Sequence, residues 1–280
     1  MALIAKAAGP TSHDVVDRVR RALGTERVGH LGTLDPFAAG LLVAVVGRAT
    51  RLAPFAAGWR KSYEGVIRLG ATTTTDDPTG EAITTSDAWR GLGRDRVEAA
   101  LARFRGAYEQ RPPAYSAVKV EGERAYRRAR RGETVALAPR RVEVIELELV
   151  ELALPDVRFR AVVSGGTYLR SLARDVGEEL GCGAHLAALT RTRVGPFRLE
   201  EAIGPDTVTP GHLREAAVLV AGLPRLDLEQ AERAAVVHGR PLPAGQGEGG
   251  PVALFADGEL VAVAERVGDV LKPRIVVVDE

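Results

Sequence analysis

The sequence predicts an α+β fold with a largely antiparallel mixed sheet, followed by a small β-rich unit. Segments with helical spacing and segments that alternate apolar and polar residues follow one another without the strict strand–helix–strand order of parallel sheets. The pattern of residue types along the chain changes after Leu223-Pro224. Because 280 residues suffice for one large and one small domain, we expect domains at residues 1–224 and 225–280.

The first part of the chain begins with a helix. Thr11 to Asp14 offers N-cap groups before apolar residues of helical spacing, and Gly24 ends the helix after Leu23. The elements predicted next are a buried strand at 41–46, an irregular connection at 47–58, a strand at 63–70, a polar loop at 72–80 and an amphipathic helix at 95–104.

The middle of the chain departs from the sheet and returns to it. Residues 110–139 contain Pro112-Pro113 and a basic helical stretch, which we interpret as an excursion from the sheet. The elements predicted after it are strands at 142–150 and 157–163, a helix at 168–180 that ends at Gly181, and a strand at 186–197.

The last part of the chain predicts the small β-rich unit. It contains a short helix at 228–239 and a Gly/Pro-rich loop at 241–251. Asp257-Gly258 between two apolar runs is typical of a tight hairpin turn. A final strand is expected at 275–278.

Composition excludes several classes of protein. No apolar run approaches the ~20 residues that span a bilayer, and the first residues do not resemble a signal peptide. A single cysteine, Cys182, excludes an internal disulfide and a cysteine metal cluster. We therefore expect a cytoplasmic protein with no membrane association.

Positive charge is concentrated in one segment although the net charge is only +1. Residues 103–141 hold eleven arginines or lysines against four glutamates, an excess of seven positive charges. Such a patch suits contact with phosphates, and Tyr108, Tyr115 and Tyr126 within it could stack on bases. The alternative is a solvated arginine-rich helix, since the chain has 34 arginines and four lysines.

The segment from Gly29 to Gly40 is the most informative in the chain. Asp35 stands between a glycine-containing turn and Pro36, directly before the apolar run. Glycine permits backbone angles that other residues resist and proline fixes φ, so we expect Asp35 to be held in one orientation, as catalytic groups are. The alternative is an Asp-Pro turn that leads into a strand.

Five motifs are spread over most of the chain. They are Gly29–Pro36, Lys61–Glu64, Arg111–Val120 with Gly122 to Tyr126, Ser164–Leu172, and Gly181–Leu186 with Leu189–Arg191. In sequence and in order they resemble the motifs of the TruB family of tRNA pseudouridine synthases. The resemblance implies the pseudouridine synthase fold, an RNA-contacting insertion at about 105–140 and a PUA-like RNA-binding domain at the C-terminus.

The resemblance also implies the reaction. It is isomerisation of the uridine at position 55, in the T-loop of tRNA, to pseudouridine, in which a C–N bond breaks and a C–C bond forms. No group is gained or lost, so the reaction requires no cofactor and no metal, and the sequence contains no phosphate-binding glycine loop. The expected partner is the tRNA T stem-loop, bound by a monomer without a protein partner.

Three residues carry the catalytic roles in the resemblance. Asp35 supplies the carboxylate, which attacks the ribose C1′, adds to the uracil ring or abstracts the C2′ proton. Arg170 pairs with Asp35, and Tyr63 stacks on the uracil and takes the C5 proton. In isolation, Arg170 would be a helix-surface arginine and Tyr63 a half-buried strand tyrosine.

Five further residues are expected to bind the RNA. His30 fills the space that the flipped base leaves, and Leu189 forms an apolar wall of the pocket; the alternatives are a turn histidine and an ordinary core leucine. Lys119, Arg124 and Tyr168 contact the T stem-loop. We also expect His185 in the core, and Lys6 and Lys272 as peripheral contacts only.

Two other functions fit the same sequence. One is a synthase of this fold that modifies a different RNA, as the guide-directed relatives do. The other is an RNA-binding or tRNA-folding factor without catalysis. Sequencing of modified sites in a deletion strain would discriminate the first alternative. Asp35→Asn distinguishes a synthase from a binding factor, because a synthase would lose product formation and keep its RNA affinity.

Overall fold

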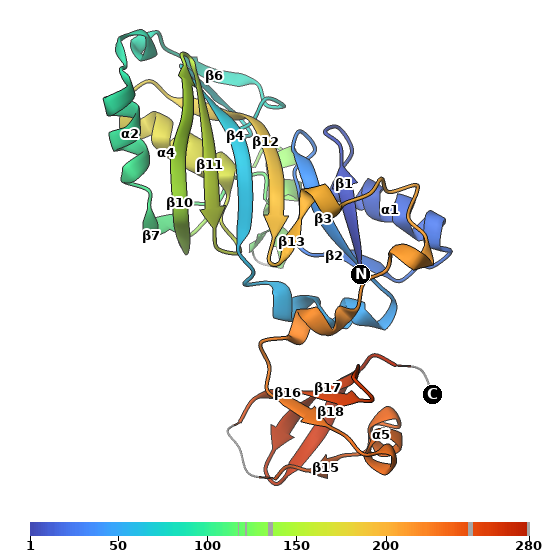
Figure 1. Cartoon of the computed structure of the whole chain (residues 1–280). Helices are drawn as coiled ribbons and strands as arrows, with labels where there is room; N and C mark the ends of the chain where they lie inside the picture. The colour runs from blue at the N-terminus through green and yellow to red at the C-terminus, as the bar shows by residue number, and fades with distance from the viewer. Residues whose placement is uncertain (117, 121, 134–136, 246–248, 279–280) are drawn as a thin grey trace.

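The computed structural model describes all residues except 117, 121, 134–136, 246–248 and 279–280, and it does not describe the side chains of residues 119, 120, 124, 126, 129 and 130. The structure is α+β, as predicted (Figure 1). A nine-stranded sheet runs in the order β1-β3-β12-β4-β11-β10-β7, with β2 and β13 at its side. Its pairs are antiparallel except that of β3 with β12.

The strands of the large sheet are β1 (Ala2–Lys6), β2 (Val28–His30), β3 (Ala39–Val46), β4 (Lys61–Leu69), β7 (Gly106–Gln110), β10 (Arg140–Ala153), β11 (Asp156–Val163), β12 (Ala184–Val194) and β13 (Phe197–Arg198). Two small hairpins stand apart from it, β5 (Ala71–Thr73) with β6 (Ala82–Thr85) and β8 (Lys119–Val120) with β9 (Glu123–Arg124).

Helices cover the large sheet. Apolar residues of α2 (Arg94–Ala102) and α4 (Leu169–Leu180) share a core with β4, β10, β11 and β12. The helix α1 (Ser12–Leu23) packs on β1 and β3. Its Thr11 capping box and the left-handed Gly24 confirm the predicted helix boundaries. The short α3 (Ala125–Arg130) belongs to the excursion after β7.

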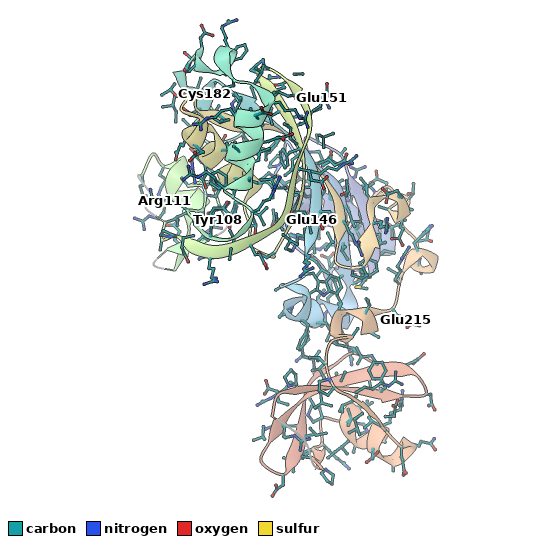
Figure 2. The ribbon with its side chains drawn as sticks, turned by 60° about the vertical axis from the view of Figure 1, so that its left-hand side comes forward. Tyr108, Arg111, Glu146, Glu151, Cys182 and Glu215 are labelled. Carbon is teal, nitrogen blue, oxygen red and sulfur yellow. The ribbon has the colours of Figure 1, made fainter. Side chains whose placement is uncertain are left out.

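A second sheet forms the C-terminal unit, in the order β14-β16-β17-β18-β15. Its elements are β14 (Arg225–Asp227), α5 (Gln230–Val237), β15 (Leu242–Pro243), β16 (Pro251–Ala256), β17 (Glu259–Val267) and β18 (Val270–Val276). Figures 1 and 2 show it at one end of the large sheet, beyond η1 (Gly47–Ala56) and η5 (Ala216–Val220). No helix in the described residues is long and apolar enough to cross a membrane.

Side chains alternate between the two faces of β16. Ala253 and Phe255 join an apolar cluster with Leu219 and Val220 next to the large sheet. Val252, Leu254 and Ala256 join another with α5. Burial on both faces explains the uninterrupted apolar run in the sequence.

Several local predictions were wrong. The strands β1 and β2 were not predicted, because they are short and lack alternation. The expected irregular connection at 47–58 is largely the 3-10 helix η1. The predicted loop at 72–80 begins inside β5, and the Gly/Pro-rich loop at 241–251 contains β15. The last strand begins at Val270 rather than Ile275 and ends at Val276.

Candidate active site

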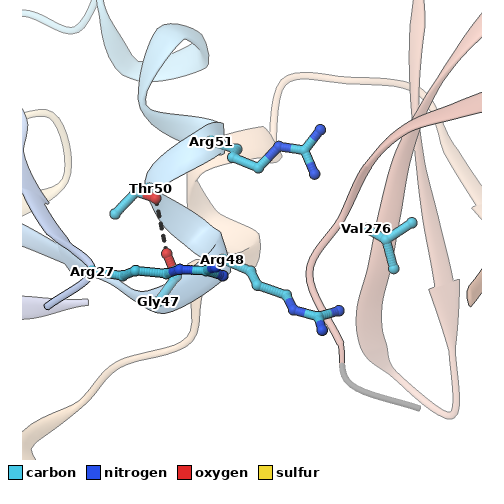
Figure 3. A pocket seen from close by; sticks show the side chains of 6 residues that line it. All are labelled: Arg27, Gly47, Arg48, Thr50, Arg51 and Val276. Carbon is cyan, nitrogen blue, oxygen red and sulfur yellow. Dashed lines mark hydrogen bonds between the residues drawn. The ribbon is translucent and has the colours of Figure 1, made fainter. Parts of the chain in front are cut away.

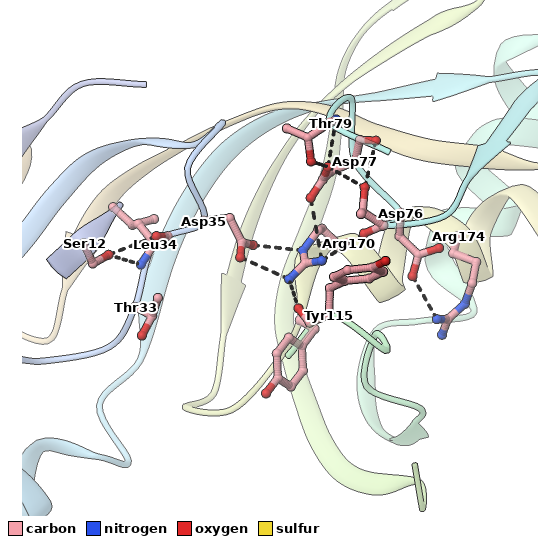
Figure 4. Close-up of polar contacts among 12 residues, drawn as sticks. Ser12, Thr33, Leu34, Asp35, Asp76, Asp77, Thr79, Tyr115, Arg170 and Arg174 are labelled. Atoms are coloured by element: carbon pink, nitrogen blue, oxygen red, sulfur yellow. Dashed lines mark hydrogen bonds and ion pairs between the residues drawn. The ribbon is translucent and has the colours of Figure 1, made fainter. Parts of the chain in front are cut away.

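The turn that carries Asp35 is fixed by hydrogen bonds from neighbouring elements. Ser12, at the start of α1, accepts from the Leu34 N–H at 2.8 Å and donates to the Leu34 carbonyl at 2.9 Å (Figure 4). The Gly9 N–H donates to the Pro36 carbonyl at 2.7 Å. The backbone on both sides of Asp35 is therefore held, as the glycine and proline positions predict.

Lys6 holds the same turn from below the surface. Its side chain is buried, and its ammonium group donates to the carbonyls of Ala38 at 2.6 Å and Asp35 at 3.2 Å. Burial lowers the pKa of Lys6 to about 8, although the nearby Asp35 charge acts in the opposite direction. The predicted peripheral role of Lys6 was wrong, because four backbone carbonyls enclose its amine.

Arg191 of β12 fixes the preceding part of the turn. Its side chain is wholly buried, and its guanidinium donates to the carbonyls of Leu41 at 2.8 Å and Gly32 at 3.0 Å. The backbone of Gly40 lies so close to Arg191 that a Cβ on Gly40 would stand 2.3 Å from the Arg191 carbonyl oxygen. Only glycine fits there, with φ of +115°.

Asp35 and Arg170 form a bidentate ion pair (Figure 4). Arg170 Nε lies 2.9 Å from Asp35 Oδ2, and Nη2 lies 3.0 Å from Oδ1. The Asp35 side chain is 34% exposed and that of Arg170 only 5%. The structure therefore brings the two predicted residues together, 135 positions apart in sequence, with the carboxylate accessible and the guanidinium behind it.

A second carboxylate, Asp77, lies behind Arg170. Its Oδ2 is 3.6 Å from Arg170 Nη1, and its Oδ1 accepts from the Thr75 hydroxyl at 2.7 Å and the Thr79 N–H at 2.9 Å. The Thr75 carbonyl accepts from Arg170 Nη1 at 2.9 Å. Asp77 was not predicted, because residues 72–80 have the composition of a polar loop. A buried arginine such as Arg170 requires an acidic partner, and this requirement is the signal that could have pointed to Asp77.

The segment after β7 is fastened to the start of α4. Gln110 is buried; its amide accepts from the Tyr168 N–H at 2.9 Å and donates to the Tyr168 carbonyl at 3.1 Å. The Ser171 hydroxyl donates to the Arg111 carbonyl at 2.8 Å. Arg111 is labelled in Figure 2. Arg170 Nη2 donates to the Tyr115 carbonyl at 2.8 Å. Gln110 was also missed, since nothing in the sequence marks its partner.

Tyr63 and Leu189 lie in one apolar cluster with Leu34, the residue before Asp35. Leu189 pairs with Gly65, two residues from Tyr63 on the adjacent strand, so the two side chains share a face of the sheet. Both are buried. Their positions are compatible with the predicted pocket, and their roles stay predictions.

His30 ends β2, a few residues before Asp35. Burial, and secondarily the charge of Arg191, lowers the pKa of His30. Its Nδ1 is buried and has no hydrogen-bond partner within the described residues. A neutral ring at the rim of the Asp35 turn is suited to contact with a base.

The remaining predicted residues occupy varied positions. The Tyr168 ring packs against Val118, Ala125 and Leu137 of the excursion, and burial raises its pKa. Lys119 and Arg124 pair through their backbones in the β8–β9 hairpin, and their side chains lie outside the described residues. His185 is buried, and its Nδ1 lies 2.9 Å from the Ala71 carbonyl oxygen, so the core prediction is confirmed. Lys272 lies on β18, in the C-terminal sheet.

The arrangement provides a carboxylate that is held rigidly and remains accessible. Two carboxylates share one guanidinium, and two further cations fix the turn backbone. No group of three or more His, Cys, Asp or Glu within the described part of the chain could hold a metal ion.

Comparison with known families agrees with this geometry. The family model of the TruB family pseudouridylate synthase N-terminal domain matches residues 20–169, and that of the tRNA pseudouridylate synthase B C-terminal domain matches residues 170–221. This chain belongs to the TruB family. The reaction of the family is the isomerisation of uridine to pseudouridine, so the chain is an enzyme of that class.

Individual TruB relatives match nearly the whole chain. The chain is 47% identical to the tRNA pseudouridine synthase B of Thermobifida fusca (strain YX), over 98% of this chain and 97% of the relative. It is 42% identical to that of Solibacter usitatus (strain Ellin6076), over 95% and 94%. Among solved structures, a Cbf5-Nop10-Gar1 complex contains a chain with a TM-score of 0.71 and 28% identity, over 99% of this chain and 84% of that one. The predicted pseudouridine synthase fold is thereby confirmed.

Proposed function

We propose that this TruB-family enzyme isomerises the uridine at position 55, in the T-loop of tRNA, to pseudouridine. The observation that carries the proposal is the accessible Asp35 carboxylate held by the buried Arg170. Support for tRNA as the substrate comes from relatives such as that of Thermobifida fusca, named tRNA pseudouridine synthase B. In this proposal the protein acts as a monomer without a cofactor.

The target uridine must leave the base stack to reach Asp35. Extruding a nucleotide costs a few kcal/mol. His30 offsets part of this cost by occupying the space that the base vacates. Its lowered pKa suits this role, because a neutral imidazole can stack between bases without desolvating a charge.

Asp35 then initiates cleavage of the glycosidic bond. The bond between C1′ and uracil N1 breaks, the uracil turns, and a bond from C1′ to C5 forms. The proton on C5 is removed and N1 gains one, so atoms and electrons balance without an added reactant. Attack at C1′, addition to the ring and abstraction of the C2′ proton all require a carboxylate fixed beside the nucleoside.

Arg170 and the apolar residues position the reacting groups. The bidentate contact fixes both oxygens of Asp35, which favours one orientation of attack. Tyr63 stacks on the uracil and takes the C5 proton on its phenol oxygen as its own proton leaves toward N1, so the phenol ends neutral, while Leu189 confines the turning ring. Their shared cluster with Leu34 supports a pocket directly beside the Asp35 turn.

The basic excursion and the C-terminal unit hold the rest of the T stem-loop. Within the insertion at about 105–140, Lys119 and Arg124 contact phosphates, and Tyr168 lies at its base. Residues 225–280 form the PUA-like RNA-binding domain, next to a catalytic domain of residues 1–224.

The test is incubation of the purified protein with an unmodified tRNA transcript, without added cofactors, followed by mapping of pseudouridine. We expect product at position 55 only. Asp35→Asn should abolish product and leave the RNA Kd within about twofold, since the substitution changes one carboxylate oxygen to an amide. Product elsewhere would contradict the T-loop assignment, and product from Asp35→Asn would contradict the role of Asp35.

A further inference from the structure

Lys61 begins β4 and lies against the turn that carries Asp35. A Cβ on Gly32 would stand 3.1 Å from Lys61 Cε and 3.9 Å from its Nζ, so the amine lies beside the Gly32 backbone. Lys61 and Tyr63 are two positions apart on one strand, and their side chains therefore leave the same face of the sheet. Lys61 thus lies on the face that holds the proposed uracil pocket.

The amine of Lys61 keeps hydrogen-bond donors that no described residue uses. An ammonium group has three N–H donors, and within the described residues that of Lys61 donates to the Trp59 carbonyl alone, at 3.1 Å. Burial, and secondarily the charge of Arg191, lowers the pKa of Lys61 to about 8, so the amine is still mostly protonated at neutral pH. A partly buried positive charge is costly unless an anion pairs with it. The contacts of Lys61 therefore indicate a site for an anion.

The other cations around the Asp35 turn are already engaged. Lys6 is buried and enclosed by four backbone carbonyls. Arg191 is wholly buried and donates to three backbone carbonyls. Arg170 divides its donors between the two oxygens of Asp35 and two backbone carbonyls. Among these four cations, and within the part of the chain that the structure describes, Lys61 therefore combines partial exposure with unused donors.

Lys61 is also distinct from the largest basic hollow near this end of the sheet. That hollow, of about 460 Å³, lies between η1 and β18 (Figure 3). Its lining includes Arg27 and Arg51 but no residue of the Asp35 turn and not Lys61. An anion at Lys61 would therefore lie at the candidate active site and not between the two sheets.

We propose that the Lys61 amine binds one of the two backbone phosphates that flank the target uridine. The inference rests on the proposed function, in which His30 occupies the vacated place in the base stack and Asp35 meets the extruded nucleoside. The RNA backbone that joins the stack to the extruded uridine must then pass the segment between His30 and Asp35. Gly32 belongs to that segment, and the Lys61 amine lies beside it.

The contact would hold the reacting sugar. Each flanking phosphate is bonded to the ribose of the target nucleotide, so fixing the phosphate restricts where C1′ can lie relative to Asp35. An ammonium group is a compact charge that pairs with phosphate oxygens without a fixed geometry, which suits a backbone that bends as the base leaves the stack. Lys61 is thus a positioning residue for the proposed reaction.

The test is a double-mutant cycle between Lys61→Gln and single neutral linkages in the RNA. Both proteins carry Asp35→Asn, so that the RNA stays unmodified during the measurement. The RNAs are T stem-loops with a methylphosphonate at the 5′ linkage of the target uridine, at its 3′ linkage, at one linkage in the stem, or at none. Glutamine removes the charge and can still donate to the Trp59 carbonyl.

We expect Lys61→Gln to raise the Kd of the all-phosphate RNA about tenfold, as for the loss of a hydrogen bond to a charged group. With one of the two flanking linkages neutralised, the two proteins should bind alike, within about twofold. With the stem linkage neutralised, the tenfold difference should persist. Lys61→Met, which suits a partly buried position, gives the same comparison if Lys61→Gln is unstable.

Lys6→Gln in the same background is the matched control. Its amine lies at the same turn and has no donor to spare, so any change in Kd should be equal for all four RNAs. An unchanged Kd for Lys61→Gln, or an effect that persists with either flanking linkage neutralised, would overturn the inference. The second outcome would also identify a free anion as the occupant, since neutralising an RNA linkage cannot affect a site that the RNA does not fill.

Mapping of pseudouridine with the wild-type protein tests the proposed function separately. Product at position 55 without coupling to either flanking linkage would retain that function and reject only the role of Lys61. Product at another uridine would reject the T-loop assignment, and the same cycle, with methylphosphonates around that uridine, would still decide whether Lys61 binds a flanking phosphate.

Discussion

The contact between Asp77 and Arg170 provides the sharpest test of the site. Asp77→Asn keeps the shape of the side chain and an oxygen for Thr75 and Thr79, but it removes the charge 3.6 Å from Arg170 Nη1. Coulomb's law gives about 5 kcal/mol for that separation at an effective dielectric constant of 20. The substitution does not leave an unpaired buried charge, because Arg170 keeps its bidentate partner Asp35.

The main effect of Asp77→Asn is on the position of the Arg170 guanidinium. Without Asp77 behind it, the guanidinium is drawn toward Asp35, and a displacement of about 1 Å can cost up to 100-fold in rate. We therefore expect the single-turnover rate of pseudouridine formation to fall about 10- to 100-fold, equivalent to roughly 1.4–2.7 kcal/mol. The RNA Kd should not change, since Asp77 is 4% exposed.

The adjacent residue supplies the control. Asp76 belongs to the same turn but pairs with Arg174 at 3.1 Å, and asparagine tolerates its positive φ of 59°. Asp76→Asn should keep a rate within about threefold of the wild type. Equal rates for wild type and Asp77→Asn, equal losses for both variants, or a weakened RNA affinity would each refute the reasoning.

Three further predictions concern the supports of the site. Gln110→Met leaves the Tyr168 N–H and carbonyl without their partner, so denaturant titration should show a loss of about 3 kcal/mol, and the turnover rate should fall more than tenfold. Gly40→Ala should destabilise the fold by about 4 kcal/mol through steric overlap and strain, against about 1 kcal/mol for Gly24→Ala, where nothing lies within 4 Å; similar values for the two would contradict the overlap. The lowered pKa of Lys6, about 8 against 10.5, means that the folded state binds fewer protons than the unfolded state between these values, so stability should rise with pH there. The rise in Tm from pH 7 to 9.5 should be smaller in Lys6→Met, and an equal rise would show that Lys6 does not titrate in this range.

The sequence predicted the elements whose signals are local. The helix at 12–23 follows from the Thr11 cap and Gly24, and the hairpin at Asp257-Gly258 from two residues that accept positive φ, here 50° and 82°. The short strands β1 and β2 could not be predicted, because their pairing with β3 is decided by contacts distant in the chain. The 3-10 helix η1 escaped prediction for the same reason: its apolar residues face the C-terminal unit.

The sequence predicted the residues at the centre of the candidate site but not the residues that hold them in place. The pairing of Asp35 with Arg170 was expected from the motifs that carry them, although no periodicity connects positions so far apart. Asp77, Gln110 and Arg191 act through backbone carbonyls, buried charges or amide pairs that form only after the chain has folded. Their sequence surroundings resemble an ordinary turn and ordinary strands.

The two-sided burial of β16 bears on how such a chain could change over evolutionary time. Phe255 and its neighbours complete an apolar layer that Leu219 and Val220 begin. Deletion of the C-terminal unit would expose this apolar layer to solvent and make the protein prone to self-association, independently of any effect on RNA binding. We therefore expect relatives that lack this unit to carry polar residues at the positions of Leu219 and Val220.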